Sequence, residues 1–300
     1  MACCRSRRHD TFAALGGAVV VLAAAATASA APLPPALAPA LAIQPTGSAA
    51  GQAQAEKPAA AKKAEIDEKA REVLDRAIEV QLGEHAKKKD IESVRMSGAM
   101  VMPAVGMNAE MTILMDADGN VAITQIIPGI GTIRSGVTGD VGWSLSELTG
   151  PMIMSEAEVA QTRQQADIYG ELNWHERASK ITYAGEASVT LPDRSTRPTH
   201  QLTVVDRETG KEETHHFDRE KGTRLQSLTM QAVPGEGEIP VTTTYLDYEK
   251  IGQMMVPKRS VVVVGPQQME MRVSEWVVNG DVPEDAFEMP AEVKAIAERG

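Results

Sequence analysis

The sequence predicts an α+β domain in which a long antiparallel sheet is accompanied by few helices. Two observations support this fold class. Only two segments carry helix signals, one an apolar repeat and the other a capping box, whereas many short runs, separated by turn signals, are typical of strands. A parallel sheet needs a crossover helix between successive strands, and the helical segments are too few to supply them. We therefore expect a meandering antiparallel sheet.

The first predicted element is a helix from Glu65 to about Lys88. Its apolar residues recur three and four positions apart, which places them on one face of a helix. These residues are Ile66, Ala70, Val73, Leu74, Ala77, Ile78 and Leu82. Gly83 weakens the last turn, and the lysines at 87–89 suit the negative end of the helix dipole.

After Asp90 the hydrophobic repeat changes from the helical value of about 3.6 residues to the strand value of about 2. From Met107 to Met115 apolar residues alternate with largely polar ones, as in a strand with one buried face. Asp118 and Gly119 then predict a tight hairpin turn. Further strands are predicted at Val121–Ile127, Thr132–Thr138, Lys180–Leu191, Gln201–Asp206, Glu213–Phe217, Arg224–Val233, Val241–Tyr248, Met254–Val264 and Met269–Val278.

A second helix is predicted from Ser155 to about Ile168, because Ser155 and Glu158 have the spacing of a capping box. The segment Leu145–Pro151, which follows Trp143, is predicted to be a loop that leads to this helix.

The first 30 residues have the three parts of a secretory signal peptide, namely a basic start, an uncharged apolar stretch at 12–26 and small residues at 28–30. The alternative is an uncleaved membrane anchor, because an apolar stretch of this length can span a bilayer. We therefore expect a periplasmic protein exported by an N-terminal signal peptide, or else one that is N-terminally membrane-anchored.

The rest of the chain is predicted to contain one folded domain. Residues 31–64 consist mostly of Ala, Pro, Gln, Gly and Lys, and too few large apolar side chains are present to offset the entropy of ordering them. They are predicted to form a disordered linker. The folded domain is expected at 65–290, and 291–300 is expected to be a C-terminal tail.

Composition excludes several classes of function. The chain has 30 Lys and Arg against 41 Asp and Glu, a net charge of −11. Nucleic-acid binding depends on many basic contacts to phosphates, so nucleic acid is excluded as a partner. Both cysteines, Cys3 and Cys4, precede the apolar stretch and are lost if the leader is cleaved. The mature chain would then have no disulfide, no thiolate nucleophile and no cysteine-based zinc site.

The methionines are the strongest candidates for a ligand site. Residues two apart in a strand share a face, and several methionines recur at that spacing. Their side chains are unbranched and polarisable, so they repack around ligands of irregular shape. We interpret them as the wall of an apolar cavity, the alternative being a core in which methionine fills gaps. The expected lining residues are Met100, Met102, Met107, Met111, Ile113, Met115, Trp143, Met152, Met154, Met269 and Met271.

The sequence predicts no catalytic residue, no metal site and no cofactor. His215 and His216 are adjacent in a predicted strand, so they point to opposite faces and cannot share a metal ion. No nucleophile elbow, phosphate-binding loop or dinucleotide-binding motif is present. We expect a protein that is not an enzyme. A hydrolase assembled from scattered carboxylates with His175 or His200 is an alternative without a sequence motif to support it.

Several local patterns, in this order, resemble periplasmic lipoprotein carriers of the LolA/LolB-like superfamily, in particular the outer-membrane lipoprotein-sorting relatives. The residues that carry the resemblance are Val80–His85, Ile91–Gly98, Val205–Lys211, Phe217–Arg219, Tyr245–Tyr248, Ile251–Gly252, Val256–Pro257 and Pro283–Pro290. Together they extend over nearly the whole predicted domain, from about Glu65 to Pro290.

The resemblance implies a long curved antiparallel sheet, an incomplete β-barrel covered by two or three helices, with an apolar cavity that takes acyl chains. In such proteins the region after Trp143 is a mobile cover near the cavity mouth. Such carriers usually line the cavity with aromatic residues. This chain departs from that pattern, since it has only 3 Phe, 3 Trp and 4 Tyr.

The function implied is that of an exported non-enzymatic carrier or sensor that binds a lipid or lipoprotein acyl chain. The alternative is an envelope protein–protein interaction module with a filled core and no ligand, whose partner is another envelope protein.

Overall fold

The computed structural model describes residues 63–207, 209–233 and 237–298. The predicted signal peptide and nearly all of the predicted linker lie outside these residues. The strands are β1 (Glu65–Ile66), β2 (Ser93–Met102), β3 (Met107–Asp116), β4 (Val121–Ile127), β5 (Gly131–Thr138), β6 (Val141–Ser146), β7 (Gly150–Ile153), β8 (Ala178–Thr190), β9 (Thr196–Asp206), β10 (Glu212–Asp218), β11 (Arg224–Val233), β12 (Gly237–Ile251), β13 (Met254–Val264) and β14 (Gln267–Val278). The helices are α2 (Glu68–Leu82), α3 (His85–Lys88), α4 (Glu156–Ala166), α5 (Trp174–Arg177) and α6 (Ala291–Ala297), with short 3-10 turns η2 (Pro103–Val105) and η3 (Gly170–Leu172).

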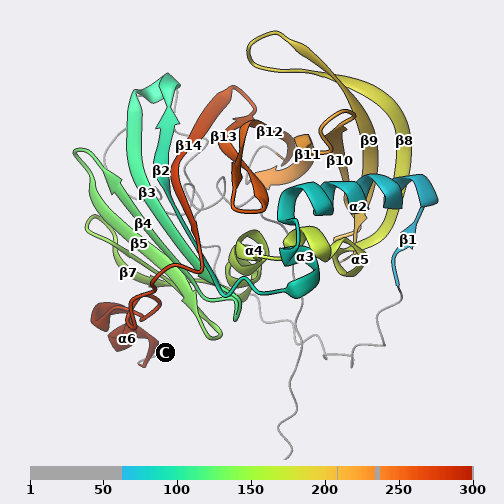
Figure 1. Cartoon of the computed structure of the whole chain (residues 1–300). Coiled ribbons are helices and arrows are strands. Elements are labelled where there is room, and N and C mark those ends of the chain that lie inside the picture. The colour runs from blue at the N-terminus through green and yellow to red at the C-terminus, as the bar shows by residue number, and fades with distance from the viewer. Residues whose placement is uncertain (1–62, 208, 234–236, 299–300) are drawn as a thin grey trace, which may run out of the picture.

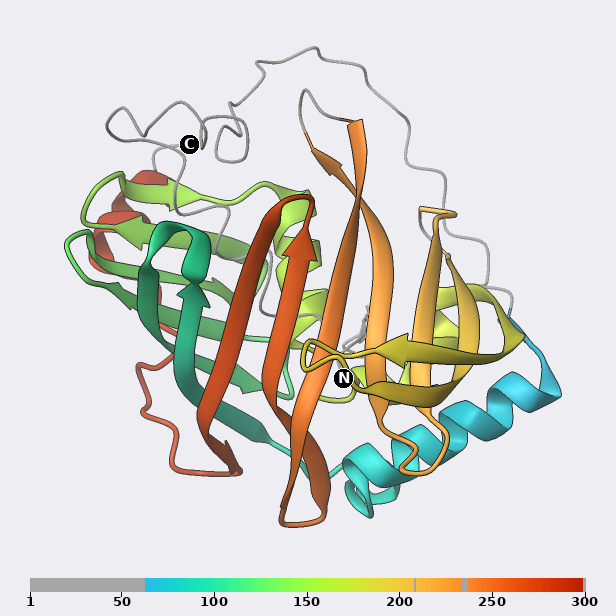
Figure 2. The same ribbon diagram turned by 90° about the horizontal axis from the view of Figure 1, so that it is seen from above.

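The described strands form one 14-stranded sheet in the order β1-β8-β9-β10-β11-β12-β13-β14-β2-β3-β4-β5-β6-β7. Neighbouring strands are antiparallel, except that β1 pairs with β8 in parallel. The sheet curves strongly, but β1 and β7 stand at its two ends, so the barrel is incomplete (Figures 1 and 2). The predicted α+β class with a long curved sheet is confirmed.

The helices close the curved sheet. In Figure 1, α3, α4 and α5 lie between the two arms of the sheet, and α2 lies along one end, where it contacts β8 and β13. One core cluster joins α4 to β2–β5, β13 and β14, and a second joins α2 and α5 to β8–β10. None of the helices in the described part of the chain has both the length and the apolar character required to cross a bilayer.

The first predicted helix is wrong in its boundaries. Glu65 and Ile66 form β1 instead, because they pair with Lys180 and Ile181 of β8. The helix then breaks at Gly83, whose φ of 57° lies in the left-handed region that glycine adopts without steric penalty. A short second helix, α3, follows the break.

The predicted loop Leu145–Pro151 is also wrong. Residues Val141–Ser146 pair along β5, and Gly150–Ile153 pair back along β6, so the region forms the last hairpin of the sheet. The second predicted helix is confirmed as α4. Ser155 caps it, accepting a hydrogen bond from the Glu158 backbone N–H, while the Glu158 carboxylate accepts one from Ser155 N at 2.7 Å. Within the predicted tail, α6 packs beside β6 and β7 (Figure 1).

Candidate functional site

Methionines of β2, β3 and β14 form one apolar surface, which we call the methionine wall. Directly opposed residues of neighbouring strands share a face of a sheet. Met100 is opposed to Ala109 of β3 and to Met271 of β14, and Met102 is opposed to Met107. The remaining members follow at alternate positions along the same strands. The methionine wall consists of Met96, Met100, Met102, Met107, Met111, Met115, Met269 and Met271.

Burial changes along the methionine wall. Met111, Ile113 and Met115 are at most 4% exposed and belong to the core cluster that includes Val159 and Ile168, so this end is filled. At the opposite end of the strands, three members are only half-buried; these are Met102, Met107 and Met269. The wall therefore passes from packed core to a partly solvent-accessible apolar surface.

Three other predicted lining residues lie elsewhere. Trp143 is opposed to Gly136, and the alternation across β3–β6 places it on the face opposite the methionine wall. There it is buried, and its Nε1 donates to Thr138 Oγ1 at 3.2 Å. Met152 is 49% exposed on the edge strand β7, and Met154 packs against the core beneath α4.

A group of polar side chains lies on the same face as the methionine wall, at the other arm of the sheet. One row of opposed residues crosses β10 to β14, and it consists of His215, Ser227, Thr243, Val262 and Met269. Helix α5 covers the His215 end of this row. We call the following set the inner polar cluster: Trp174, Arg177, Glu213, His215, Arg224, Ser227 and Tyr245.

Glu213 is the centre of the inner polar cluster. Its Oε2 accepts a hydrogen bond from Arg177 Nη2 at 3.3 Å and lies 3.0 Å from His215 Nε2. The side chains of Arg177 and His215 are only 8% and 3% exposed. Trp174 lies between them: the Arg177 guanidinium carbon is 4.4 Å from its ring centroid, and its ring meets His215 edge-on at 5.0 Å. Arg224 similarly lies over Tyr245, at 4.8 Å.

The surroundings shift two pKa values. Burial alone would raise the pKa of the Glu213 carboxyl, but the hydrogen bond from His215 and the charge of Arg177 outweigh it and lower that pKa from 4.5 to about 2. Burial lowers the pKa of His215 below its ordinary 6.5, although Glu213 opposes this. At neutral pH the cluster therefore contains an ionised glutamate and a neutral histidine.

The buried nitrogen atoms of the inner polar cluster without a hydrogen-bond partner among the described residues include Trp174 Nε1, Arg177 Nε and His215 Nδ1. The indole and guanidinium nitrogens can only donate. In the neutral His215 the Nε2–H donates to Glu213, so Nδ1 is unprotonated and can only accept. Trp174 and Arg177 thus each leave one buried donor without an acceptor among the described residues.

Arginines hold the covering helices in place. Arg207 donates to the carbonyl oxygens of Glu176 at 2.7 Å, Ala178 at 2.6 Å and His175 at 3.1 Å, which satisfies the C-terminal end of α5. Arg76 of α2 donates to the carbonyl of Arg219 at 3.0 Å and to that of Glu220, in the turn between β10 and β11.

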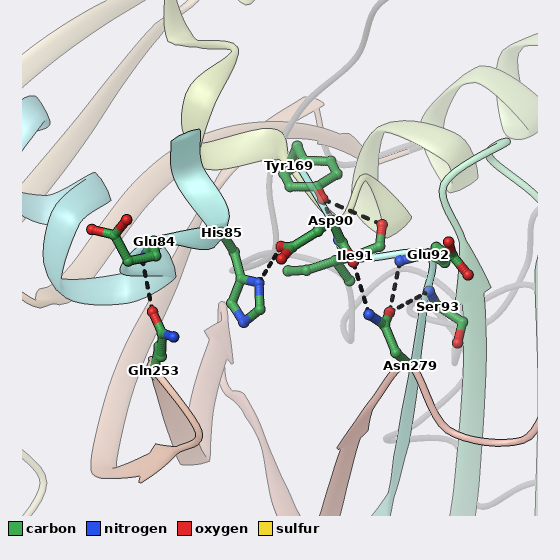
Figure 3. Close-up of polar contacts among 9 residues, drawn as sticks. All are labelled: Glu84, His85, Asp90, Ile91, Glu92, Ser93, Tyr169, Gln253 and Asn279. Carbon is green, nitrogen blue, oxygen red and sulfur yellow. Dashed lines mark hydrogen bonds and ion pairs between the residues drawn. The ribbon is translucent and has the colours of Figure 1, made fainter. Parts of the chain in front are cut away.

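A network of hydrogen bonds connects α3 to the start of β2, the first strand of the methionine wall (Figure 3). His85 Nδ1 lies 2.5 Å from Asp90 Oδ1, and Asn279, just after β14, donates to the Asp90 carbonyl at 2.7 Å. The Asn279 side-chain oxygen accepts from the backbone N–H groups of residues 92 and 93, at 2.7 and 3.2 Å. Tyr169 Oη accepts from Ile91 N at 2.5 Å. The entry to β2 is therefore fixed to both β14 and the segment after α4.

Two hollows accompany these residues. A groove of about 450 Å³ lies on the sheet face opposite the methionine wall, and a smaller one of about 170 Å³ lies between α2 and β9–β10. Polar residues such as Ser97, Thr112 and Ser274 line much of the larger groove. Across the described ranges, no three His, Cys, Asp or Glu side chains gather in a way that would hold a metal ion.

The inner polar cluster was not predicted from the sequence, although one signal was available. Glu213, His215 and Phe217 alternate in a predicted strand, so they share a face, and the apolar Phe217 indicates that this face is buried. The contacts with Arg177 and Trp174 could not be found in this way, because they come from a separate helix. The expectation that His215 and His216 face opposite ways is confirmed, since His216 lies within 3.1 Å of Thr199 Oγ1 on the other face.

No known protein-family profile matches the sequence, and no curated protein matches it. Solved structures do match. A LolA superfamily protein from Nitrosomonas europaea is 14% identical, over 73% of this chain and 97% of that chain, with a TM-score of 0.49. A putative outer membrane lipoprotein-sorting protein domain from Vibrio parahaemolyticus is 11% identical, over 72% and 97%, with a TM-score of 0.46.

A DUF1329 family protein from Desulfovibrio piger is 9% identical, over 74% of this chain and 98% of that chain, with a TM-score of 0.51. This match shows a shared fold at very low sequence identity. A LolA superfamily protein and a lipoprotein-sorting domain are thus among the solved structures to which this chain is similar.

Proposed function

We propose that the protein is an exported, non-enzymatic carrier or sensor that binds a lipid or a lipoprotein acyl chain against the methionine wall. The observation that carries the proposal is that methionines from three adjacent strands share one face and are half-buried at one end of it. In this proposal the protein acts in the periplasm, released from its leader or anchored by it.

The methionine wall suits a flexible apolar guest. Burying about fifteen methylene groups of a palmitoyl chain contributes roughly 12 kcal/mol, at about 0.8 kcal/mol each. Association costs at least about 4 kcal/mol of lost translational and rotational freedom. The remaining 8 kcal/mol or so corresponds to a Kd of about 1 μM, which sets the range of a titration.

The test uses the full chain expressed with its own leader and recovered from the envelope. Extraction followed by mass spectrometry should detect a co-purified lipid, and a fluorescent fatty acid should bind at micromolar concentration. Met107→Glu places a charge at the half-buried end of the wall and should weaken fatty-acid binding at least tenfold. The matched control is Met230→Glu, because Met230 is exposed on the opposite face of the sheet.

Absence of co-purified lipid, together with no fatty-acid binding up to 100-fold above the expected Kd, would contradict the proposal. The mass of the recovered protein, compared with that of the full sequence, decides between a cleaved leader and an anchor.

The second candidate is an envelope protein–protein interaction module. It is favoured by the filled end of the wall, where Met111 and Met115 belong to the same core cluster as Val159 and Ala166 of α4. Cross-linking in the envelope should then capture one stoichiometric protein partner, with no lipid in the extract.

A further inference from the structure

We infer that the inner polar cluster binds the carboxylate or phosphate group of an amphiphile whose apolar chain lies along the methionine wall. The inference rests on the proposed function and deepens it, because it specifies the chemistry of the polar end of the ligand.

The first argument is the shortage of acceptors. Trp174 Nε1 and Arg177 Nε are buried donors that find no acceptor in the described part of the chain. A buried donor left unsatisfied costs about 1–3 kcal/mol. The carboxylate within the cluster, that of Glu213, is already engaged by Arg177 Nη2 and by His215 Nε2. An incoming oxygen acceptor would satisfy atoms that the described residues leave unsatisfied.

The second argument concerns the kind of acceptor. An arginine guanidinium presents a planar array of N–H groups that matches the two oxygens of a carboxylate or phosphate. Nη2 of Arg177 donates to Glu213, whereas its Nε has no acceptor among the described residues and can donate to an oxygen of the ligand. The low exposure of Arg177 strengthens such a charge-assisted bond, because water competes poorly for it.

The third argument is continuity with the methionine wall. Tyr245 of the cluster is opposed to Ser260, which is opposed to Met271 of the wall. Strands are spaced about 4.8 Å apart, so Tyr245 and Met271 are separated by about 10 Å along the sheet. The parallel row from His215 to Met269 passes only Ser227, Thr243 and Val262, none of which carries a charge that would exclude an apolar chain. The inner polar cluster and the methionine wall thus lie on one continuous face of the sheet.

The experiment measures displacement of a neutral apolar fluorophore from the full-length protein by hexadecanoate, hexadecyl phosphate and hexadecanol. We expect at least one anionic probe to bind ten times or more tightly than the alcohol. The tighter of the two anionic probes, hexadecanoate or hexadecyl phosphate, identifies the recognised group as a carboxylate or a phosphate.

Two variants locate the effect. Arg177→Met should remove the preference for the anionic probe while hexadecanol binding stays within twofold. Trp174→Phe keeps the aromatic packing and removes the indole donor, so it should lower the affinity for the anionic probe about threefold or more. This variant also tests the inference if Arg177→Met fails to fold. The matched control is Arg95→Met, on the opposite face of the sheet and 45% exposed, which should change neither affinity.

Equal affinities for acid, phosphate and alcohol in the wild-type protein would overturn this inference and leave the proposed function standing. The inference also fails if Trp174→Phe and Arg177→Met weaken the alcohol as much as the anion, since that would indicate a structural role. Failure of all three probes to displace the fluorophore, or of the fluorophore to bind, would instead refute the proposed function itself.

Discussion

Replacing Glu213 by glutamine tests whether the inner polar cluster is electrostatically coupled to folding. The substitution preserves shape but removes the charge that faces Arg177 at 3.3 Å and His215 at 3.0 Å. The folded-state pKa of the carboxyl, about 2, lies below its ordinary 4.5, so ionised Glu213 stabilises the fold above pH 4.5 and loses that effect as the pH falls towards 2. The difference corresponds to about 3 kcal/mol at neutral pH.

The assay is urea unfolding of the wild type and of Glu213→Gln at several pH values. We expect the variant to be less stable by about 3 kcal/mol at pH 7, about 2 kcal/mol at pH 3.5 and about 1 kcal/mol at pH 2.5, because the wild type progressively loses its charge. The matched control is Glu186→Gln. Glu186 pairs with Arg219 at 2.7 Å but is 57% exposed, so its loss should change stability by less than about 1 kcal/mol.

Two results would refute the reasoning. One is a Glu213→Gln variant no less stable at pH 7 than Glu186→Gln. The other is a stability difference that does not shrink between pH 7 and pH 2.5, which would assign the loss to packing rather than to the carboxylate charge.

Three further substitutions probe the framework of the site. Gly98→Ala should destabilise by about 1–3 kcal/mol or more in urea unfolding, because a Cβ there would lie 2.1 Å from the Arg272 carbonyl oxygen; a wild-type midpoint would contradict the close packing of β2 and β14. Asn279→Ala removes three hydrogen bonds and places alanine at a φ of 53°, so we expect a loss of about 2–4 kcal/mol and faster amide exchange at residues 92 and 93. Asn279→Gly should recover the part of this loss that is due to backbone strain. Ser155→Ala should lower stability by about 1 kcal/mol and Ser155→Asp by much less, as thermal unfolding would measure; equal losses would argue against capping by this side chain.

Local rules explain why much of the fold could be predicted. The capping box fixes the start of α4 because Ser155 and Glu158 satisfy each other's backbone groups within one turn. The alternation in β3 fixes which side chains share a face, because the strand repeat is close to two residues. Both rules depend only on neighbours in the sequence.

The errors arose where distant segments decide the outcome. Ile66 has the helical spacing of its neighbours, yet it pairs with Ile181 of β8, more than a hundred residues away. Trp143 was expected at the cavity mouth, but its strand joins β5 in a register that turns it to the opposite face. Register between strands is set by pairing across the whole sheet, and a shift by one residue reverses every side chain.

By itself, the sequence determined the α+β class, the start of the second helix and the shared face of the methionines within each of β2, β3 and β14, because propensity, capping and alternation are properties of short segments. Only the tertiary structure decided that α4 fills one end of the methionine wall and that Arg177 and Trp174 meet Glu213 and His215. Those contacts join elements far apart in the chain, and their energies depend on burial, which exists only once the sheet has curved and the helices have closed over it.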